Sequence, residues 1–315
     1  MVVTNKRLHQ IILCGLSISC LSNVQAASAV EEQPSDTVQQ TKKMGGLSGT
    51  PVNTAISGGL SAPEKKLLTV FNASFRDKSN IVDDNGKGAR TLSNDIYLLK
   101  LRYGFTDSVE FFMVPGYINN KLDSFSNTPS TDIHGPTDFG FGGTYMFLGQ
   151  RQGDPLSAAV TFAVNMPTGQ QGSNHPAGSD VWSYQAKIGM TKVWHPNHRF
   201  DTDIGFVQPT ETGNGGVRKD TTLTWQGSYH YVFNDNFDVG LEFTLDKTQD
   251  SERNGVTMRN GYTEMYVGPA ANYCLPKWNM WLGVNVLFPV LRDYDIPTAS
   301  DDIRIEVKLG KVWSW

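Results

Sequence analysis

The chain has 315 residues, a formal net charge of −4 at pH 7 and 39% hydrophobic residues, with a mean hydropathy of −0.33. No apolar run approaches the roughly 20 residues that a membrane-spanning helix needs, which excludes a helical membrane protein. The slight acidic balance also excludes the basic footprint of a nucleic-acid-binding protein. A transmembrane β-barrel stays compatible with this composition, because only every second residue of its strands faces lipid.

The N-terminus has the pattern of a secretory signal peptide over residues 1–26. Lys6 and Arg7 precede a short apolar stretch over 11–21, and Ala26 ends a cleavage motif with a small residue. A buried N-terminal helix is the alternative, but the apolar stretch is short and polar sequence follows it. Removal of the signal also removes two of the three cysteines, so Cys274 has no partner for an intrachain disulfide.

Residues 27–66 are polar and rich in Ser, Thr, Gly and Pro, and they show no sustained periodicity. We expect them to form a flexible periplasmic N-terminal arm. The character of the sequence changes at Leu67, where apolar and polar residues begin to alternate. Residues 67–315 are therefore taken as the barrel domain.

The alternation has a period of two, which is typical of strands with one apolar face. It is clearest near the C-terminus, where a strand would place all the charged residues on one face: Ile303, Ile305, Val307 and Leu309 take one phase, and Arg304, Glu306 and Lys308 the other. The count of such segments is about twelve, an even number, as single-chain outer-membrane barrels require. The expected strands cover 67–77, 91–106, 108–119, 137–148, 156–168, 179–195, 198–209, 221–234, 237–248, 262–275, 278–291 and 302–315.

Long and short connections alternate along the chain. The long polar loops fall near 78–90, 120–136, 169–178, 210–220, 249–261 and 292–301, and mostly tight turns fall between them. An outer-membrane barrel predicts this order, with long extracellular loops and short periplasmic turns, whereas a soluble β-sandwich has no reason to sort its loops. We therefore predict an all-β fold: a transmembrane antiparallel barrel in the bacterial outer membrane, with both termini periplasmic.

Aromatic residues gather near the expected strand ends, as they do at the headgroup boundaries of a bilayer. Near the periplasmic ends lie Tyr103, Phe105, Tyr145, Phe147, Trp194, Phe200, Tyr231, Phe233, Tyr273, Trp278 and Trp313. Near the other ends lie Tyr117, Trp182, Tyr184 and Trp225. A sandwich core filled by aromatics would not sort them by strand end.

The charged residues of the strands take the phase that faces away from lipid. They are candidates for lining the lumen: Lys100, Arg102, Lys187, Arg199, Asp201, Asp203, Glu242, Asp246, Arg304, Glu306 and Lys308. These side chains either line a small aqueous path or pair across the strands and seal a narrow barrel. We favour the path.

Sites for chemistry are sparse, and we predict no catalytic residue, no metal site and no cofactor. Ser228 and His230 share the inward phase of one strand, but a separation of two residues puts their Cβ atoms roughly 6.5–7 Å apart, and no orienting acid is identifiable. His195, His198 and Asp201 cluster around a turn where histidines need no metal. The segment 83–86 lacks the ordered oxygen ligands of a calcium loop.

Several short motifs recur in order at barrel-like spacing: Tyr103-Gly104-Phe105-Thr106-Asp107, Gly135-Pro136-Thr137-Asp138-Phe139-Gly140, Met166-Pro167-Thr168-Gly169 and Val267-Gly268-Pro269-Ala270. With them the chain resembles the outer-membrane family described as "putative MetA-pathway of phenol degradation", over about residues 67–315. The resemblance implies an outer-membrane transport role loosely linked to aromatic catabolism. The last residues resemble the barrel assembly signal through Lys308, Gly310, Trp313 and Trp315, although such signals usually end in Phe.

From this sequence we predict an outer-membrane channel for passive movement of small solutes, hydrophobic or aromatic compounds among them. A lipid-active barrel enzyme or a surface-loop binding protein is the alternative. The expected partners are outer-membrane lipids, the barrel assembly machinery and a small-molecule solute, with no nucleic acid.

Overall fold

The computed structural model describes residues 50–81, 90–122, 131–169, 177–194, 197–210, 212–213, 216–234, 236–295 and 300–313. No helix in these ranges is both long and apolar enough to cross a bilayer. The predicted signal peptide, the segment 83–86, His195 and Trp315 lie outside the described residues.

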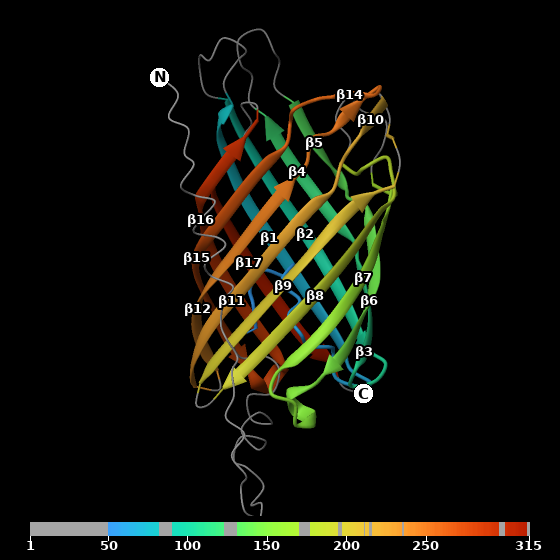
Figure 1. The fold of residues 1–315 in the computed structure, drawn as a ribbon. Coiled ribbons are helices and arrows are strands. Elements are labelled where there is room, and N and C mark those ends of the chain that lie inside the picture. Colours follow the sequence, from blue (N-terminus) through green and yellow to red (C-terminus); the bar gives the residue numbers. More distant parts are fainter. Residues whose placement is uncertain are drawn as a thin grey trace, which may run out of the picture. The chain divides into compact units, whose positions relative to one another are not determined.

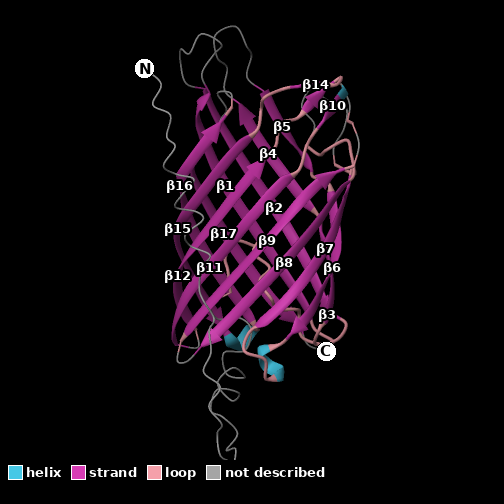
Figure 2. Ribbon diagram, in the orientation of Figure 1, coloured by secondary structure: helices cyan, strands magenta, loops and turns pink. Residues whose placement is uncertain are grey.

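Antiparallel strands close into a barrel of twelve strands, when β3–β4 and β5–β6 are each counted as one interrupted strand (Figures 1 and 2). β1 pairs with β2 on one side and with β17 on the other, so the first and last strands meet and the sheet is closed into a cylinder. The strands are β1 (Leu67–Ile81), β2 (Arg90–Gly104), β3 (Val109–Val114), β4 (Gly116–Leu122), β5 (Thr131–Pro136), β6 (Phe139–Leu148), β7 (Ser157–Met166), β8 (Ser183–Trp194), β9 (His198–Pro209), β11 (Thr222–Asn234), β12 (Phe237–Thr248), β15 (Tyr262–Leu275), β16 (Met280–Tyr294) and β17 (Ser300–Trp313).

The seam between the first and last strands is long and regular. Its register runs from Leu67 opposite Trp313 to Ser79 opposite Ser300, with one irregularity after Asp77. The indole Nε1 of Trp313 donates to Thr69 Oγ1 across the seam at 3.0 Å. A closed barrel leaves no unpaired strand edge in the hydrocarbon, where each unsatisfied backbone group would cost several kcal/mol.

Two neighbouring strands are interrupted at the same level of the wall. Pro115 separates β3 from β4, since proline cannot donate to a strand ladder. Residues 137–138 separate β5 from β6. Beyond these breaks β4 and β5 continue as a hairpin paired to β2. The Asp138 carboxylate accepts hydrogen bonds from the backbone N–H groups of Gly169 and Ser179, and so ties the break to the adjoining loops.

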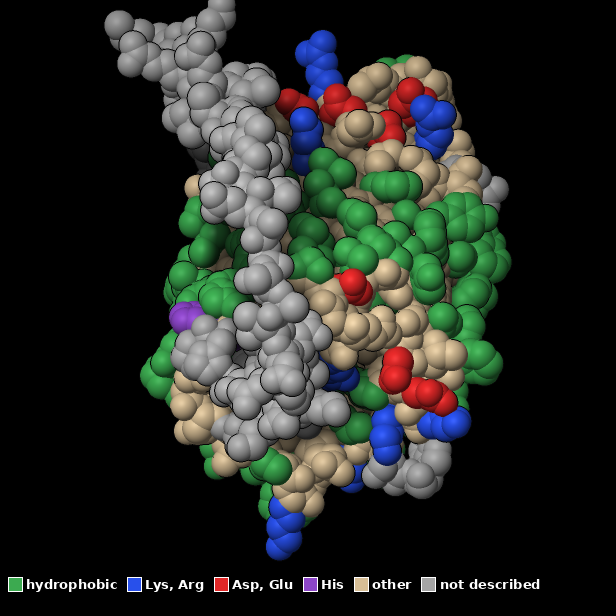
Figure 3. Space-filling view, turned by 60° about the horizontal axis from the view of Figure 1, so that its bottom comes forward, with side chains coloured by type: hydrophobic (Ala, Val, Ile, Leu, Met, Phe, Trp, Pro, Cys, Tyr) green, Lys and Arg blue, Asp and Glu red, His purple; other side chains and the backbone are tan. Residues whose placement is uncertain are grey.

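The two faces of the wall differ in chemistry. Large apolar side chains such as Phe162 and Leu241 point outwards and are exposed, whereas the inward positions are polar and buried. Figure 3 shows the hydrophobic side chains spread over the outer surface and most charged side chains near the two ends. An apolar outer face around a polar interior is typical of strands that face lipid, and it identifies the chain as an outer-membrane barrel.

The two ends of the barrel also differ. One end, here called the turn end, holds the short connections and the 3-10 helices η1 (Gln150–Gln152) and η3 (Pro276–Trp278). The opposite end, called the loop end, holds a small sheet of β10 (Val217–Arg218), β13 (Glu252–Arg253) and β14 (Val256–Thr257).

The sequence predicted this architecture closely. The strand number and the sidedness of the aromatic residues are confirmed: Tyr103, Phe105, Trp278 and Trp313 at the turn end, and Trp182 at the loop end, are exposed on the outer face. Two expectations were wrong in detail. The segment 108–119 is not one continuous strand, because Pro115 breaks it, and part of the expected loop 120–136 pairs as the β4–β5 hairpin.

The predicted orientation can be tested by labelling single cysteines on intact cells. Val256 at the loop end is 68% exposed, and the native Cys274 is buried. Val256→Cys should react with a membrane-impermeant maleimide on whole cells. Lys277→Cys, at the turn end, should react only after the outer membrane is permeabilised. The reverse pattern would place the termini at the cell surface.

The assembly-signal glycine has a packing role that can also be tested. A Cβ atom at Gly310 would lie 2.1 Å from Cζ2 of Trp281. Gly310→Ala should therefore lower the free energy of unfolding by about 1–3 kcal/mol, as overpacking does. In a Trp281→Leu background the same substitution should cost much less, as measured by urea unfolding in a double-mutant cycle. Equal costs in both backgrounds would contradict this packing role.

Candidate functional site

A segment preceding β1 occupies the lumen of the barrel. Residues 50–66, here called the plug, run inside the wall near the turn end (Figure 1). Val52, Ile56 and Ala62 are buried against the wall. The sequence-based expectation of a flexible arm over 27–66 therefore does not describe residues 50–66; residues 27–49 lie outside the described part of the chain.

Carboxylates of the wall accept hydrogen bonds from the plug backbone. Glu242 accepts from the N–H of Val52 and, at 3.1 Å, from that of Asn53. Asp203 accepts from Ser57 N–H at 2.6 Å. Farther along the plug, Glu110 accepts from Ala62 N–H. Each bond satisfies a buried backbone donor with a charged acceptor, the stronger class of hydrogen bond.

Cations of the wall bind the plug carbonyls in the complementary way. Lys308 Nζ donates to the carbonyl oxygens of Thr50 and Pro51 and to Thr50 Oγ1. Lys187 Nζ donates to Ala55 O at 2.9 Å. Arg102 donates to Leu60 O at 3.2 Å. The plug is thus held mainly through its main chain, by wall residues of both signs.

Glycines make this close approach possible. Gly58 has a φ of +61°, which side-chain-bearing residues rarely adopt. On the wall, a Cβ atom at Gly189 would lie 2.1 Å from Gly58 O, and one at Gly104 would lie 2.1 Å from Pro63 O. The plug backbone therefore packs directly on the strand backbone of β8 and β2.

A fully buried polar network supports Glu242 from the wall side. His230 Nδ1 lies 2.8 Å from Asp238 Oδ1, and its Nε2 lies 3.4 Å from Glu242 Oε1. Asn285 donates to both Glu242 and Glu306, at 2.6 and 3.1 Å. Partners on β11, β12, β16 and β17 therefore fix the carboxylate that holds the plug.

The structure places all eleven predicted lumen residues on the inner face. Most are buried, and Lys100, Arg102 and Asp246 are partly exposed. Five of them bind the plug backbone directly: Arg102, Lys187, Asp203, Glu242 and Lys308. Two more, Arg199 and Asp201, form an ion pair at 2.7 Å, and Asp201 accepts from Thr191, which in turn accepts from the N–H of Gly59. Whether these residues line a solute path stays a prediction.

Arg304 belongs to a separate cluster. It pairs with Asp301 and Glu264, and its guanidinium lies 3.6 Å from the centroid of the Tyr266 ring. The charge row of β17 therefore divides: Arg304 finds acids on its own and a nearby strand, whereas Lys308 binds plug carbonyls.

The structure also shows the surroundings of the residues in the two weaker sequence hypotheses. Ser228 Oγ has no hydrogen-bond partner among the described residues, so it does not contact His230. Asp238, which sequence reasoning missed as an acid beside His230, binds that ring instead of completing a nucleophile pair. Asp201 pairs with Arg199, whereas His198 bonds Tyr229 Oη, so these two side chains of the turn-end cluster have different partners; His195 lies outside the described residues.

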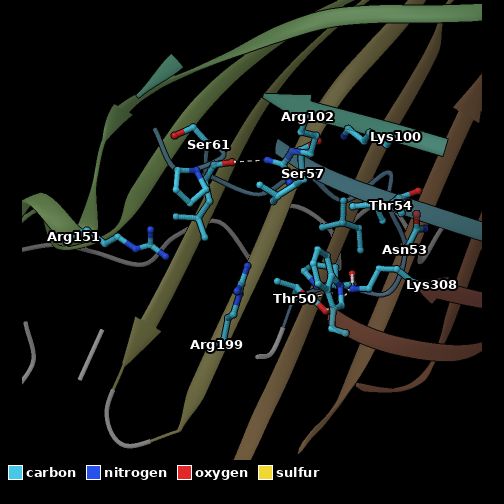
Figure 4. Close-up of a pocket in the computed structure, with 17 residues that line it drawn as sticks. Thr50, Asn53, Thr54, Ser57, Ser61, Lys100, Arg102, Arg151, Arg199 and Lys308 are labelled. Carbon is cyan, nitrogen blue, oxygen red and sulfur yellow. Dashed lines mark hydrogen bonds between the residues drawn. The ribbon is translucent and has the colours of Figure 1, made fainter. Parts of the chain in front are cut away.

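A cavity remains between the plug and the wall. Its volume is about 100 Å³. Figure 4 shows cationic side chains approaching it from several strands. Its lining combines cations with apolar residues: Lys100, Arg102, Arg151, Arg199 and Lys308 with Ile56, Leu60, Leu68, Val70 and Trp281.

Removing the central plug acceptor should destabilise the barrel strongly. Glu242→Ala deprives two plug N–H groups and His230 of a buried partner. We expect the free energy of unfolding to fall by about 3–5 kcal/mol. Glu252→Ala, which breaks an exposed pair with Arg218 at the loop end, should cost under about 1 kcal/mol. Urea unfolding in detergent measures both, and equal losses would contradict a structural role for Glu242.

The fold has known counterparts. The COG4313 outer membrane channel from Pseudomonas putida F1 superposes with a TM-score of 0.67 at 12% identity, covering 82% of this chain and 98% of that one. The P. putida toluene transporter TodX gives a TM-score of 0.44 at 11% identity, with 87% and 98% covered. The Ralstonia pickettii toluene transporter TbuX gives 0.44 at 10% identity, with the same coverage. No curated protein matches the sequence.

One family model matches most of the barrel, from the end of the plug into β16. It spans residues 65–290 and is described as "Putative MetA-pathway of phenol degradation". The match covers more than half of the chain and includes the motifs that first suggested the resemblance. The chain belongs to this family of outer-membrane β-barrels.

Proposed function

We propose that this barrel is a passive outer-membrane channel for small solutes, hydrophobic or aromatic compounds among them, and that its plug limits passage. The observation that carries this proposal is the mode of attachment of residues 50–62. They occupy the lumen through hydrogen bonds to charged wall residues, and wall cations together with apolar side chains leave an amphipathic cavity beside them.

The hydrogen bonds that hold the plug to the wall suit a plug that can leave the lumen. The plug backbone donors and acceptors are bound by side chains that water can replace, so release costs much less than unfolding the wall. A lumen without the plug would expose rings of both charge signs, which favour the entry of water. Solutes then need no energy source beyond their own gradient.

The enzyme alternative has less support. A nucleophile needs a base within hydrogen-bond reach, and Ser228 and His230 do not meet that condition. The COG4313 protein, whose fold resembles that of this chain, is described as an outer membrane channel, which agrees with the channel proposal.

A disulfide that locks the plug tests the proposal directly. A Cβ atom at Gly283 would lie 3.0 Å from Val52 Cγ2, so cysteines at these two positions are close enough to bond. In a Cys274→Ala background, oxidised Val52→Cys/Gly283→Cys protein should show lower single-channel conductance than the reduced protein in planar bilayers.

The single variant Val52→Cys is the control and should not respond to oxidation or reduction. Equal conductance in the locked and reduced states would contradict gating by the plug. Absence of any conductance in the wild type and in the reduced double variant would overturn the channel function itself.

A further inference from the structure

The plug covers the acidic residues of the lumen and leaves the basic residues facing the cavity. Its N–H groups cover the carboxylates Glu242, Asp203 and Glu110, which then face the plug. Cations are left on the other side, around the cavity. The cavity lining contains five cationic residues and no carboxylate. Seating the plug thus turns a lumen of mixed charge into a cavity with positive walls.

Two of these five cations are neutralised by an acid behind them. Arg102 pairs with Glu110 at 2.8 Å, and Arg199 pairs with Asp201 at 2.7 Å. The remaining three, Lys100, Arg151 and Lys308, make no ion pair in the described part of the chain. Lys308 binds neutral carbonyls.

Lys100 and Arg151 are the most informative of the three. Lys100 Nζ lies 4.8 Å from the centroid of the Phe112 ring and has no hydrogen bond within the described ranges. Arg151 reaches towards the cavity from η1 at the turn end, where it is exposed (Figure 4). A partly desolvated ammonium group without an acceptor is costly, and an anion in the cavity would relieve that cost.

The remaining walls fit an apolar body. Leu68, Val70 and Trp281 are buried and pack in one cluster at the edge of the cavity. The Trp281 indole is only 3% exposed, and its N–H has no hydrogen-bond partner among the described residues. A ligand that combines an anionic head with an aromatic or aliphatic body would use both kinds of wall.

We propose that this cavity is a binding site for small organic carboxylates with an apolar body, benzoate being the simplest aromatic member. The carboxylate lies at the Lys100 ammonium group, the ring lies against Leu68, Val70 and Trp281, and Arg151 and Lys308 add positive charge at other points of the lining. This inference rests on the proposed channel function in naming the substrate class, but binding at the site does not require conduction.

Equilibrium titration of benzoate into the folded, detergent-solubilised full chain tests the site. We expect saturable binding in the millimolar range or tighter. Lys100→Gln should weaken benzoate binding about tenfold, the usual effect of losing a charged hydrogen-bond partner. Arg151→Gln should weaken it about threefold, through loss of longer-range attraction for the anion. Lys121→Gln, the same change on an exposed lysine at the loop end, should leave the affinity unchanged.

Arg151 lies outside the wall strands, so its substitution reports on binding even if Lys100→Gln fails to fold. Benzyl alcohol keeps the ring without the charge, and acetate keeps the charge without the ring; both should bind at least tenfold more weakly than benzoate. Equal binding of benzyl alcohol and benzoate, no effect of Arg151→Gln, or no saturation below about 10 mM would overturn the proposal.

The conductance of the reduced plug variant separates the two proposals. Conduction without benzoate binding would overturn only the carboxylate site. Benzoate binding without conduction would overturn only the channel function.

Discussion

The structure depends on one constraint: a strand that crosses a bilayer must place its charges on the inner face. With a period of two, every apolar outward residue fixes the direction of its neighbours. In β17 the aliphatic residues leave Arg304, Glu306 and Lys308 no position except the lumen. A barrel of this size holds little water around them, so each buried charge needs a partner inside. Arg304 finds acids on the wall, and Lys308 finds the carbonyls of the plug.

The same constraint explains why the plug is bound through its main chain. An extended segment carries a donor and an acceptor at every residue, so it can satisfy charges of both signs at once. Glu242 and Lys308 lie close to one another around residues 50–53 and take opposite groups of the same backbone. Plug and wall therefore stabilise each other: the plug needs partners for its buried peptide groups, and the wall needs partners for its charges.

The same constraint explains which features could be predicted from the sequence and which could not. The strands, their number and the inward phase of eleven charged residues were predictable, because each is a local pattern with a physical cause. The plug was not, because residues 50–66 have no periodicity and their contacts are made by backbone atoms. The sequence held one signal of the plug. Inward positions of the strands carry glycine at Gly104, Gly189 and Gly283, and each leaves room for a plug residue. Glycine within a strand often marks such a close approach.

Because the plug is held by its backbone, residues that line the cavity can change without loss of the bonds that hold the plug. Most plug side chains can change without loss of the hydrogen bonds, whereas Gly58 is fixed by its left-handed conformation. Plug and wall both line the cavity proposed for the solute, and the wall contributes the cations that the plug leaves uncovered and the apolar cluster of Leu68, Val70 and Trp281. Exchange of a lining cation that does not bind the plug for a neutral residue would therefore alter the charge of the cavity without loosening the plug. Lys100 is suited to such a change, because it does not contact the plug by hydrogen bond or ion pair within the described residues. The charge of the cavity can thus change while the barrel and the plug stay as they are.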